Sequence, residues 1–377
     1  MPMPKRRAQN SQRQGKRPRP AIKKHLYLVL DDWERGYSIR QIDPDTMLCV
    51  SDSDDFCTNR DPTHLPEPAA FRFVAPALDT QFIAMGSNIV VVSSSGAAEA
   101  PTLVYDTGAA ALATGPPLPG LLSGLLVAAA GGDAVYALTT LGAGLPLAFE
   151  AFSWAPRTGD AAEPGRPTHA WSWKSVAAPP PPLPPFAPEA IVSYAVHPDG
   201  RTIFVSTAAR APARGSRRGT HSFDTARREW RCHGDWVLPF HGQGFFDREL
   251  DAWVGLDEER GCVCACQVAS RSTTSIAPPE SDRMEEKLFC FCAAGESTRS
   301  EATLAYMGDS KFCLVESVPR PRGEEDAGLG NDRVVRVTMF GLKFDRKGKL
   351  RTTSHRTSSS YVASKHVTSF SPVAFWM

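Results

Sequence analysis

One short pattern recurs along the chain: an apolar, strand-like run that ends in an apolar or aromatic residue followed by Asp. Its copies end, in chain order, at Ile42-Asp43, Tyr105-Asp106, Phe223-Asp224 and Phe344-Asp345. Another strand-like run precedes each copy, for example residues 88–92 before the second copy and 201–205 before the third. Self-similarity at a period of roughly 40 to 55 residues is typical of propellers built from four-stranded blades.

The repeat predicts an all-β fold, a β-propeller that forms a single domain over residues 25–377. Counting strand-like runs gives six blades, and soft boundaries leave seven open. A helical bundle is disfavoured, because heptad-like stripes are missing while 32 prolines and 29 glycines punctuate every region. The last residues, 372–377, are apolar, so we expect this segment or the strand that starts at Leu26 to complete the sheet of the other.

The charge of the chain is divided unevenly. Residues 1–24 carry nine basic and no acidic side chains, and the rest carries 33 basic against 41 acidic ones. The first 24 residues are too poor in apolar side chains to fold alone, so we predict a disordered basic tail. The acidic body predicts no direct binding of nucleic acid by the folded domain.

The tail also has the two-cluster form of a nuclear import signal, with an organelle transit peptide and a plain solvated tail as alternatives. The predicted signal consists of Lys5, Arg6, Arg7, Lys16, Arg17 and Arg19. No apolar region follows these charges, and no stretch reaches the ~20 apolar residues that span a bilayer. We therefore expect no membrane association and a nuclear or cytoplasmic location, where the nine cysteines stay reduced.

Several longer strings resemble a known family. They include Leu26–Ser38, His197–Thr202, Gly234–Phe240, Asp251–Gly255, Tyr306–Asp309 and Pro372–Met377. In this order they resemble the plant domain-of-unknown-function 1668 family, over roughly residues 24–377. The resemblance implies a kelch-like propeller and a plant origin, and it brings no established activity. The Ala/Pro-rich third unit departs from the family pattern.

The cysteines form the most suggestive cluster for chemistry, with Cys262, Cys264 and Cys266 followed by Cys290 and Cys292. A spacing of two places thiols along one face of a strand, whereas zinc knuckles use Cys-x₂₋₄-Cys. We predict buried structural thiols, with metal or redox binding as the alternative.

Other candidate groups have ordinary structural interpretations. Four histidines, His197, His221, His233 and His241, are predicted at loops and turns as surface or capping residues, and Asp31, Asp32 and Glu34 are predicted in a turn. The Asp that closes each repeat is expected to accept hydrogen bonds from turn amides while the preceding residue faces the core. Residues 179–185 predict a polyproline II linker, or a ligand for SH3- or WW-type domains.

These observations predict no catalytic, cofactor-binding or metal-binding residue. We expect a non-enzymatic binding or adaptor protein that engages a protein partner through its loop faces. The alternative is an enzyme whose site lies in the central channel and is assembled from residues distant in sequence. A convergent cluster of His, Asp or Glu there favours the enzyme, and an apolar face with aromatics favours binding.

Overall fold

The structure, a computed structural model, describes most of the chain beyond the N-terminal tail. The described residues are 23–50, 62–75, 80–93, 100–128, 132–140, 147–156, 168–176, 189–209, 218–257, 261–272, 277–286, 288, 301–319, 332–367 and 370–377. The predicted import signal and the proline run at 179–185 lie outside these residues.

Within the described part, the chain is all-β apart from one 3-10 turn, Pro44–Thr46. Three sheets have four strands each. The first contains, in spatial order, β26 (Val373–Trp376), β1 (Leu26–Trp33), β2 (Gly36–Ile42) and β5 (Phe71–Val74). The second contains β6 (Thr80–Met85), β7 (Asn88–Ser93), β8 (Pro101–Asp106) and β9 (Ala111–Pro117). The third contains β10 (Leu121–Ala128), β11 (Ala134–Thr140), β12 (Leu147–Pro156) and β13 (His169–Ser175).

An eight-stranded sheet consists of two antiparallel units joined by a parallel pair, β14 with β18. One unit contains β14 (Glu189–Val196), β15 (Thr202–Ala209), β16 (Gly219–Asp224) and β17 (Glu229–Gly234). The other contains β18 (His241–Asp247), β19 (Ala252–Asp257), β20 (Cys262–Gln267) and β21 (Ser281–Arg283). The last sheet contains β22 (Glu301–Gly308), β23 (Lys311–Pro319), β24 (Asp332–Phe344), β25 (Leu350–Ser364) and β3 (Leu48–Val50), and β4 (Thr63–His64) pairs with β25.

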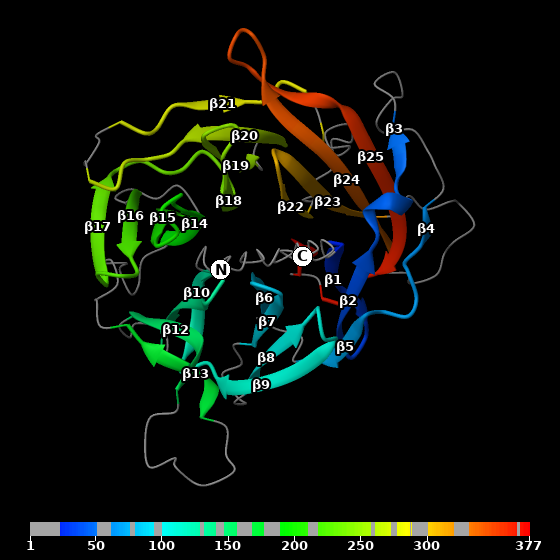
Figure 1. Cartoon of the computed structure of the whole chain (residues 1–377), viewed down its shortest axis with the longest axis horizontal. Coiled ribbons are helices and arrows are strands. Elements are labelled where there is room, and N and C mark those ends of the chain that lie inside the picture. Colours follow the sequence, from blue (N-terminus) through cyan, green and yellow to red (C-terminus); the bar gives the residue numbers. More distant parts are fainter. Residues whose placement is uncertain are drawn as a thin grey trace, which may run out of the picture.

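The sheets stand around a common centre, and the chain passes from one to the next around the ring (Figure 1). The expected closure is confirmed: β26 at the C-terminal end pairs with β1, with Leu26 opposite Trp376 and Val29 opposite Val373. The C-terminal strand therefore supplies the edge strand of the first sheet. This radial, closed arrangement of antiparallel sheets is a β-propeller.

The core lies between neighbouring sheets. Among the described residues, six apolar clusters each join one four-stranded unit to the next, and the cluster with Leu28 and Val315 joins the first unit to the last. Strand β1 shows how: Leu28 faces the last unit, whereas Val29, one residue on, faces the second. Because side chains alternate along a strand, a strand buried on both faces is apolar at every position.

The repeated Asp has the expected role. Asp106 accepts hydrogen bonds from the amides of Gly108 and Ala109, and Asp345 accepts them from Lys347 and Lys349. Each copy ends the third strand of its unit: β2, β8, β16 or β24. The preceding residue is buried in three copies, but the prediction is wrong for Phe344, which is 39% exposed.

One turn prediction is wrong, and two polar stretches contain strands. Residues 45–70 contain two short strands, β3 and β4, that add to the last sheet, and the polar stretch after Lys349 contains the fifteen-residue strand β25. Asp31 and Asp32 belong to strand β1 and are buried, so the turn consists of Glu34 and Arg35. Pairing explains both results: β25 hydrogen-bonds along most of β24, and Asp32 forms a buried ion pair with Arg40, 2.6 Å from oxygen to nitrogen.

Candidate functional site

A central cavity of about 700 Å³ lies where the innermost strands meet. Strands β6, β10, β14, β18, β22 and β26 all contribute to its wall, as do Tyr37, Phe370 and other side chains. Its described lining residues are apolar or uncharged at neutral pH apart from one imidazole, His241. Burial raises the pKa of Tyr194 in this wall to about 12, so its phenol is protonated at neutral pH. This lining is chemically closer to a binding surface than to a cluster of acids and bases.

The predicted buried thiols are confirmed for the described cysteines of β20. Cys262, Cys264 and Cys266 are all at most 8% exposed, and burial raises the pKa of Cys266 to about 12. Cys290 and Cys292 lie outside the described residues. Within the described ranges, no group of three or more His, Cys, Asp or Glu side chains is placed to hold a metal ion.

Among the described residues, no helix is both long enough and apolar enough to cross a membrane.

The four histidines are scattered, and three of them lie in strands rather than at the predicted loops and turns. His233 is 3% exposed in β17, where its Nε2 lies 2.8 Å from the hydroxyl of Ser222, and His221 lies within β16. His241 begins β18 at the central cavity. Only His197 has the expected turn-capping role, because its Nδ1 accepts the amide hydrogen of Asp199 at 3.1 Å.

The second cavity is a cleft of about 750 Å³ at the boundary of two units, β14–β17 and β18–β21. Its lining combines five arginines with four hydroxyl side chains, an indole, an imidazole and two carboxylates. These residues are Arg201, Arg227, Arg228, Arg231, Arg271, Thr202, Ser222, Ser270, Ser272, Trp230, His197, Asp224 and Glu229. We call this cavity the arginine cleft.

The β14–β15 turn forms one wall of the cleft. Pro198 fixes φ near −65°, and the amide of Gly200 donates to the carbonyl of His197 at 2.9 Å. Gly200 has φ +75°, a left-handed conformation that glycine adopts without steric cost. The predicted turn position of His197 is therefore confirmed, and the turn places Asp199 at the edge of the cleft.

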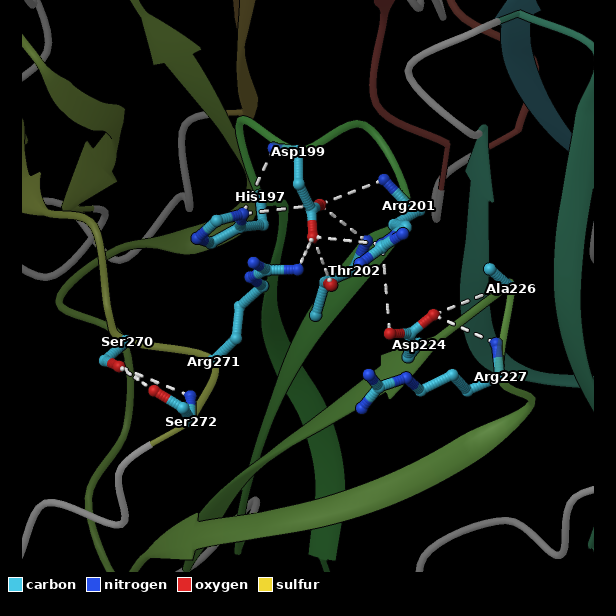
Figure 2. A network of polar contacts seen from close by, with 10 residues as sticks. All are labelled: His197, Asp199, Arg201, Thr202, Asp224, Ala226, Arg227, Ser270, Arg271 and Ser272. Carbon is cyan, nitrogen blue, oxygen red and sulfur yellow. Dashed lines mark hydrogen bonds and ion pairs between the residues drawn. The ribbon is translucent and has the colours of Figure 1, made fainter.

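Asp199 is the hub of the polar network in Figure 2. Its carboxylate accepts hydrogen bonds from the amide of Arg201 at 3.0 Å and from the hydroxyl of Thr202 at 2.7 Å. Burial acts to raise the pKa of Asp199, but these hydrogen bonds outweigh it and hold the pKa at about 2. Burial lowers the pKa of His197, and its Nδ1 already accepts an amide hydrogen, so this imidazole is neutral at pH 7.

Two arginines tie the loop after β20 to the neighbouring unit. The guanidinium of Arg271 lies 2.8 Å from the carboxylate of Asp199, and Nη1 of Arg231 donates to the carbonyl of Ser272 at 2.8 Å. Figure 2 shows Arg271 reaching Asp199 from this loop. Because both contacts cross the boundary between units, they fix the width of the cleft.

The β16–β17 turn forms the opposite wall. Asp224 accepts hydrogen bonds from the amides of Ala226 at 3.0 Å and Arg227 at 3.1 Å, and the amide of Arg228 donates to the carbonyl of Asp224 at 2.7 Å. Arg228 has φ +59°, which is uncommon for a residue other than glycine. The turn thus holds two consecutive arginines at the mouth of the cleft.

These two arginines differ from the others in their contacts. Arg227 and Arg228 are exposed, and neither guanidinium has an ion pair or hydrogen bond to another described residue. Arg201 is shared between Asp199 at 3.7 Å and Asp224 at 3.9 Å. The cleft therefore presents solvent-exposed guanidinium donors next to side chains that already have ion-pair or hydrogen-bond partners.

Sequence reasoning did not find this cleft, since its residues come from three separate segments, 197–202, 222–231 and 270–272. One signal was present. The second and third clear copies of the repeat share Asp-Thr, at residues 106–107 and 224–225, but continue with Ala109-Ala110 in one and Arg227-Arg228 in the other.

Comparisons with known proteins give fold-level similarity at low identity. TolB from Acinetobacter baumannii is 10% identical with a TM-score of 0.44, over 94% of this chain and 66% of that one. A protein from Lactobacillus plantarum is 11% identical with a TM-score of 0.44, over 94% and 100% of the two chains. The periplasmic gluconolactonase of Pseudomonas aeruginosa is 12% identical with a TM-score of 0.41, over 90% and 99%.

None of the curated proteins matches the sequence. A family model does match, and it extends over residues 23–361, from the first strand of the ring into strand β25. Its description is "Protein of unknown function (DUF1668)". Because the match covers most of the chain, this protein belongs to the DUF1668 family.

Proposed function

We propose that this chain is a kelch-like propeller of six blades that works as a binding or adaptor protein. It engages a protein partner through the loop face that carries the arginine cleft. The observation that carries the proposal is the pair Arg227 and Arg228, exposed at a cleft of about 750 Å³ without an ion pair to any described residue. Guanidinium groups in this state are ready to form bidentate hydrogen bonds with a partner.

The enzyme alternative, a site in the central channel, has less support. The described lining of the central cavity holds one imidazole, three tyrosine phenols and no carboxylate or amine, so it offers no carboxylate pair and no carboxylate–imidazole pair for acid–base chemistry. Loop turns of a rigid propeller are where binding residues are commonly found.

Affinity capture tests the proposal. The tagged full chain is compared with two double variants, R227A/R228A in the cleft and R346A/K347A in the β24–β25 turn. The control removes the same charge from an exposed turn at the corresponding place in another unit. We expect the wild type and the control to capture the same proteins and to cross-link to them at the cleft. R227A/R228A should fail to capture these proteins. Capture that is equal for all three chains would overturn the proposal.

We also propose that the basic tail directs the protein to the nucleus as well as the cytoplasm. A fluorescent fusion should lose nuclear enrichment when Lys5, Arg6, Arg7, Lys16, Arg17 and Arg19 are replaced by Ala. A wild-type fusion that stays outside the nucleus, or a variant that remains enriched there, would contradict this role.

A further inference from the structure

The arginine cleft has a property that the propeller itself does not require. The β8–β9 turn has the same construction as the β16–β17 turn: Asp106 accepts hydrogen bonds from the amides of Gly108 and Ala109, as Asp224 does from Ala226 and Arg227. The residue four positions after the Asp is left-handed in both turns, with φ +49° at Ala110 and +59° at Arg228.

Comparing the two turns shows which features belong to the backbone of the turn and which belong to its side chains. Where one turn has Ala109 and Ala110, the other has Arg227 and Arg228, so a turn of this geometry forms equally well with two methyl groups. A long cationic side chain in a left-handed conformation costs free energy that glycine would avoid. The two arginines therefore need a reason outside the fold, and their position on the cleft points to a ligand.

The charge of the cleft indicates the sign of the charge on its ligand. Five arginines face two lining carboxylates, and Asp224 is already engaged by two amides and lies 3.9 Å from Arg201. The body outside the tail carries more acidic than basic side chains, so the cleft is a positive site on an acidic body. A positively charged cleft on a negatively charged body favours an anionic partner that fits within the cleft.

The size and chemistry of the cleft narrow the ligand further. A volume of about 750 Å³ is far larger than one phosphate group, and its cations come from three separate segments. The net negative charge of the body outside the tail disfavours an extended nucleic acid, whose phosphates would continue beyond the cleft. Trp230 adds an apolar surface beside the guanidinium groups, and Ser270 and Ser272 add hydroxyl donors. Several separate carboxylates on a short peptide match this arrangement.

We infer that the arginine cleft binds an acidic peptide segment of a protein partner, with Arg227 and Arg228 forming hydrogen bonds to its Asp or Glu side chains. This inference rests on the proposed function and names the chemistry of the partner. Arg271 and Arg231 keep their contacts with Asp199 and Ser272 and hold the far wall in place.

Fluorescence anisotropy tests the inference with synthetic peptides. The probe is a labelled peptide with six Glu residues in a Gly/Ser frame, and its neutral match carries Gln at the same six positions. We expect the full chain to bind the Glu peptide at low salt, to bind the Gln peptide at least tenfold more weakly, and to lose affinity as salt rises. R227A/R228A should weaken binding at least tenfold, R346A/K347A less than twofold, and R227K/R228K should retain part of the affinity.

Each other outcome overturns the inference in a defined way. An acidic-peptide site in this cleft is excluded if the correctly folded full chain does not bind the Glu peptide. It is also excluded if the cleft variant and the control variant lose equal affinity for this peptide. Tighter binding of a peptide with two phosphoserines, or of a single-stranded oligonucleotide, would replace the acidic peptide by that ligand. If cellular capture depends on Arg227 and Arg228 while the Glu peptide does not bind, the proposed function survives and only this inference fails.

Discussion

The amide of His25 donates to the carbonyl of Met377 at 2.7 Å, and the amide of Met377 donates back to the carbonyl of His25 at 3.1 Å. These two residues continue the ladder between β1 and β26, so the two ends of the described chain are joined by backbone hydrogen bonds. A closed ring leaves no open edge between its first and last units.

The closure predicts that the C-terminal strand stabilises the whole propeller. Phe375 is 9% exposed and packs in the cluster between the first two units, so Phe375→Ala should cost about 3–5 kcal/mol of unfolding free energy. Phe344→Ala is the matched control, since this side chain is 39% exposed, and should cost under ~1 kcal/mol. Denaturant unfolding measures both, and equal small losses would show that β26 does not hold the ring closed.

The Asp32–Arg40 pair predicts a large effect from a single substitution. Both side chains are 4% exposed, and Asp32 also accepts the hydroxyl of Ser38 at 2.5 Å. Asp32→Ala leaves the buried guanidinium with the more exposed Glu67, 2.7 Å away, as its ion-pair partner, so the loss should be about 3 kcal/mol, the lower end for breaking a buried pair. Lys349→Ala breaks an ion pair whose lysine is 51% exposed and should cost about 0–1 kcal/mol. Comparable losses in the two variants would contradict the burial of the first pair.

Asp199 predicts a pH dependence of stability. Its folded pKa of about 2 is below the ordinary value of 3.8, so its contribution is present above pH ~4 and is lost as the pH falls toward 2. Allowing for solvent screening at this partly exposed site, the contribution is about 1–2 kcal/mol. Asp199→Asn should therefore be less stable than wild type at pH 5, and the difference should shrink by pH 2. A difference that is constant over this range would refute the role of the charge.

Arg228→Gly tests whether this arginine serves the fold. Glycine relieves the left-handed conformation but adds freedom to the unfolded chain, so the net change should lie between zero and a gain of about 1 kcal/mol. Ala110→Gly at the corresponding turn should change the unfolding free energy by a similar amount. Thermal and denaturant unfolding measure both variants. A loss above ~1 kcal/mol only in Arg228→Gly would mean that its side chain stabilises the fold.

Part of the fold could be predicted because it follows from local patterns. Strand segments buried on both faces, such as residues 26–30 of β1, are apolar throughout, and Asp at the end of the third strand marks a turn. Strand β25 could not be found this way: many of its side chains are Ser, Thr or charged, and its hydrogen bonds to β24 arise only in the folded sheet. The buried Asp32 was missed for a related reason, since Arg40 compensates its charge from the next strand.

The candidate site was harder to predict than the fold. His197 was predicted at a turn, and the structure confirms this position. The sequence does not show that Arg271 reaches Asp199 or that Arg231 reaches Ser272, because each contact crosses between two units of the ring. What the sequence does hold is the contrast between Ala109-Ala110 and Arg227-Arg228 in two copies of one turn.

Hydrogen–deuterium exchange of the full chain, with and without its captured partner, tests the central claim most directly, because it locates the bound surface without any substitution. The account predicts slower exchange in residues 224–231 and 270–272, which line the arginine cleft, and no change in the control turn at 345–349. Protection confined to the inner strands, around His241 and Gln243 of the central cavity, would contradict it.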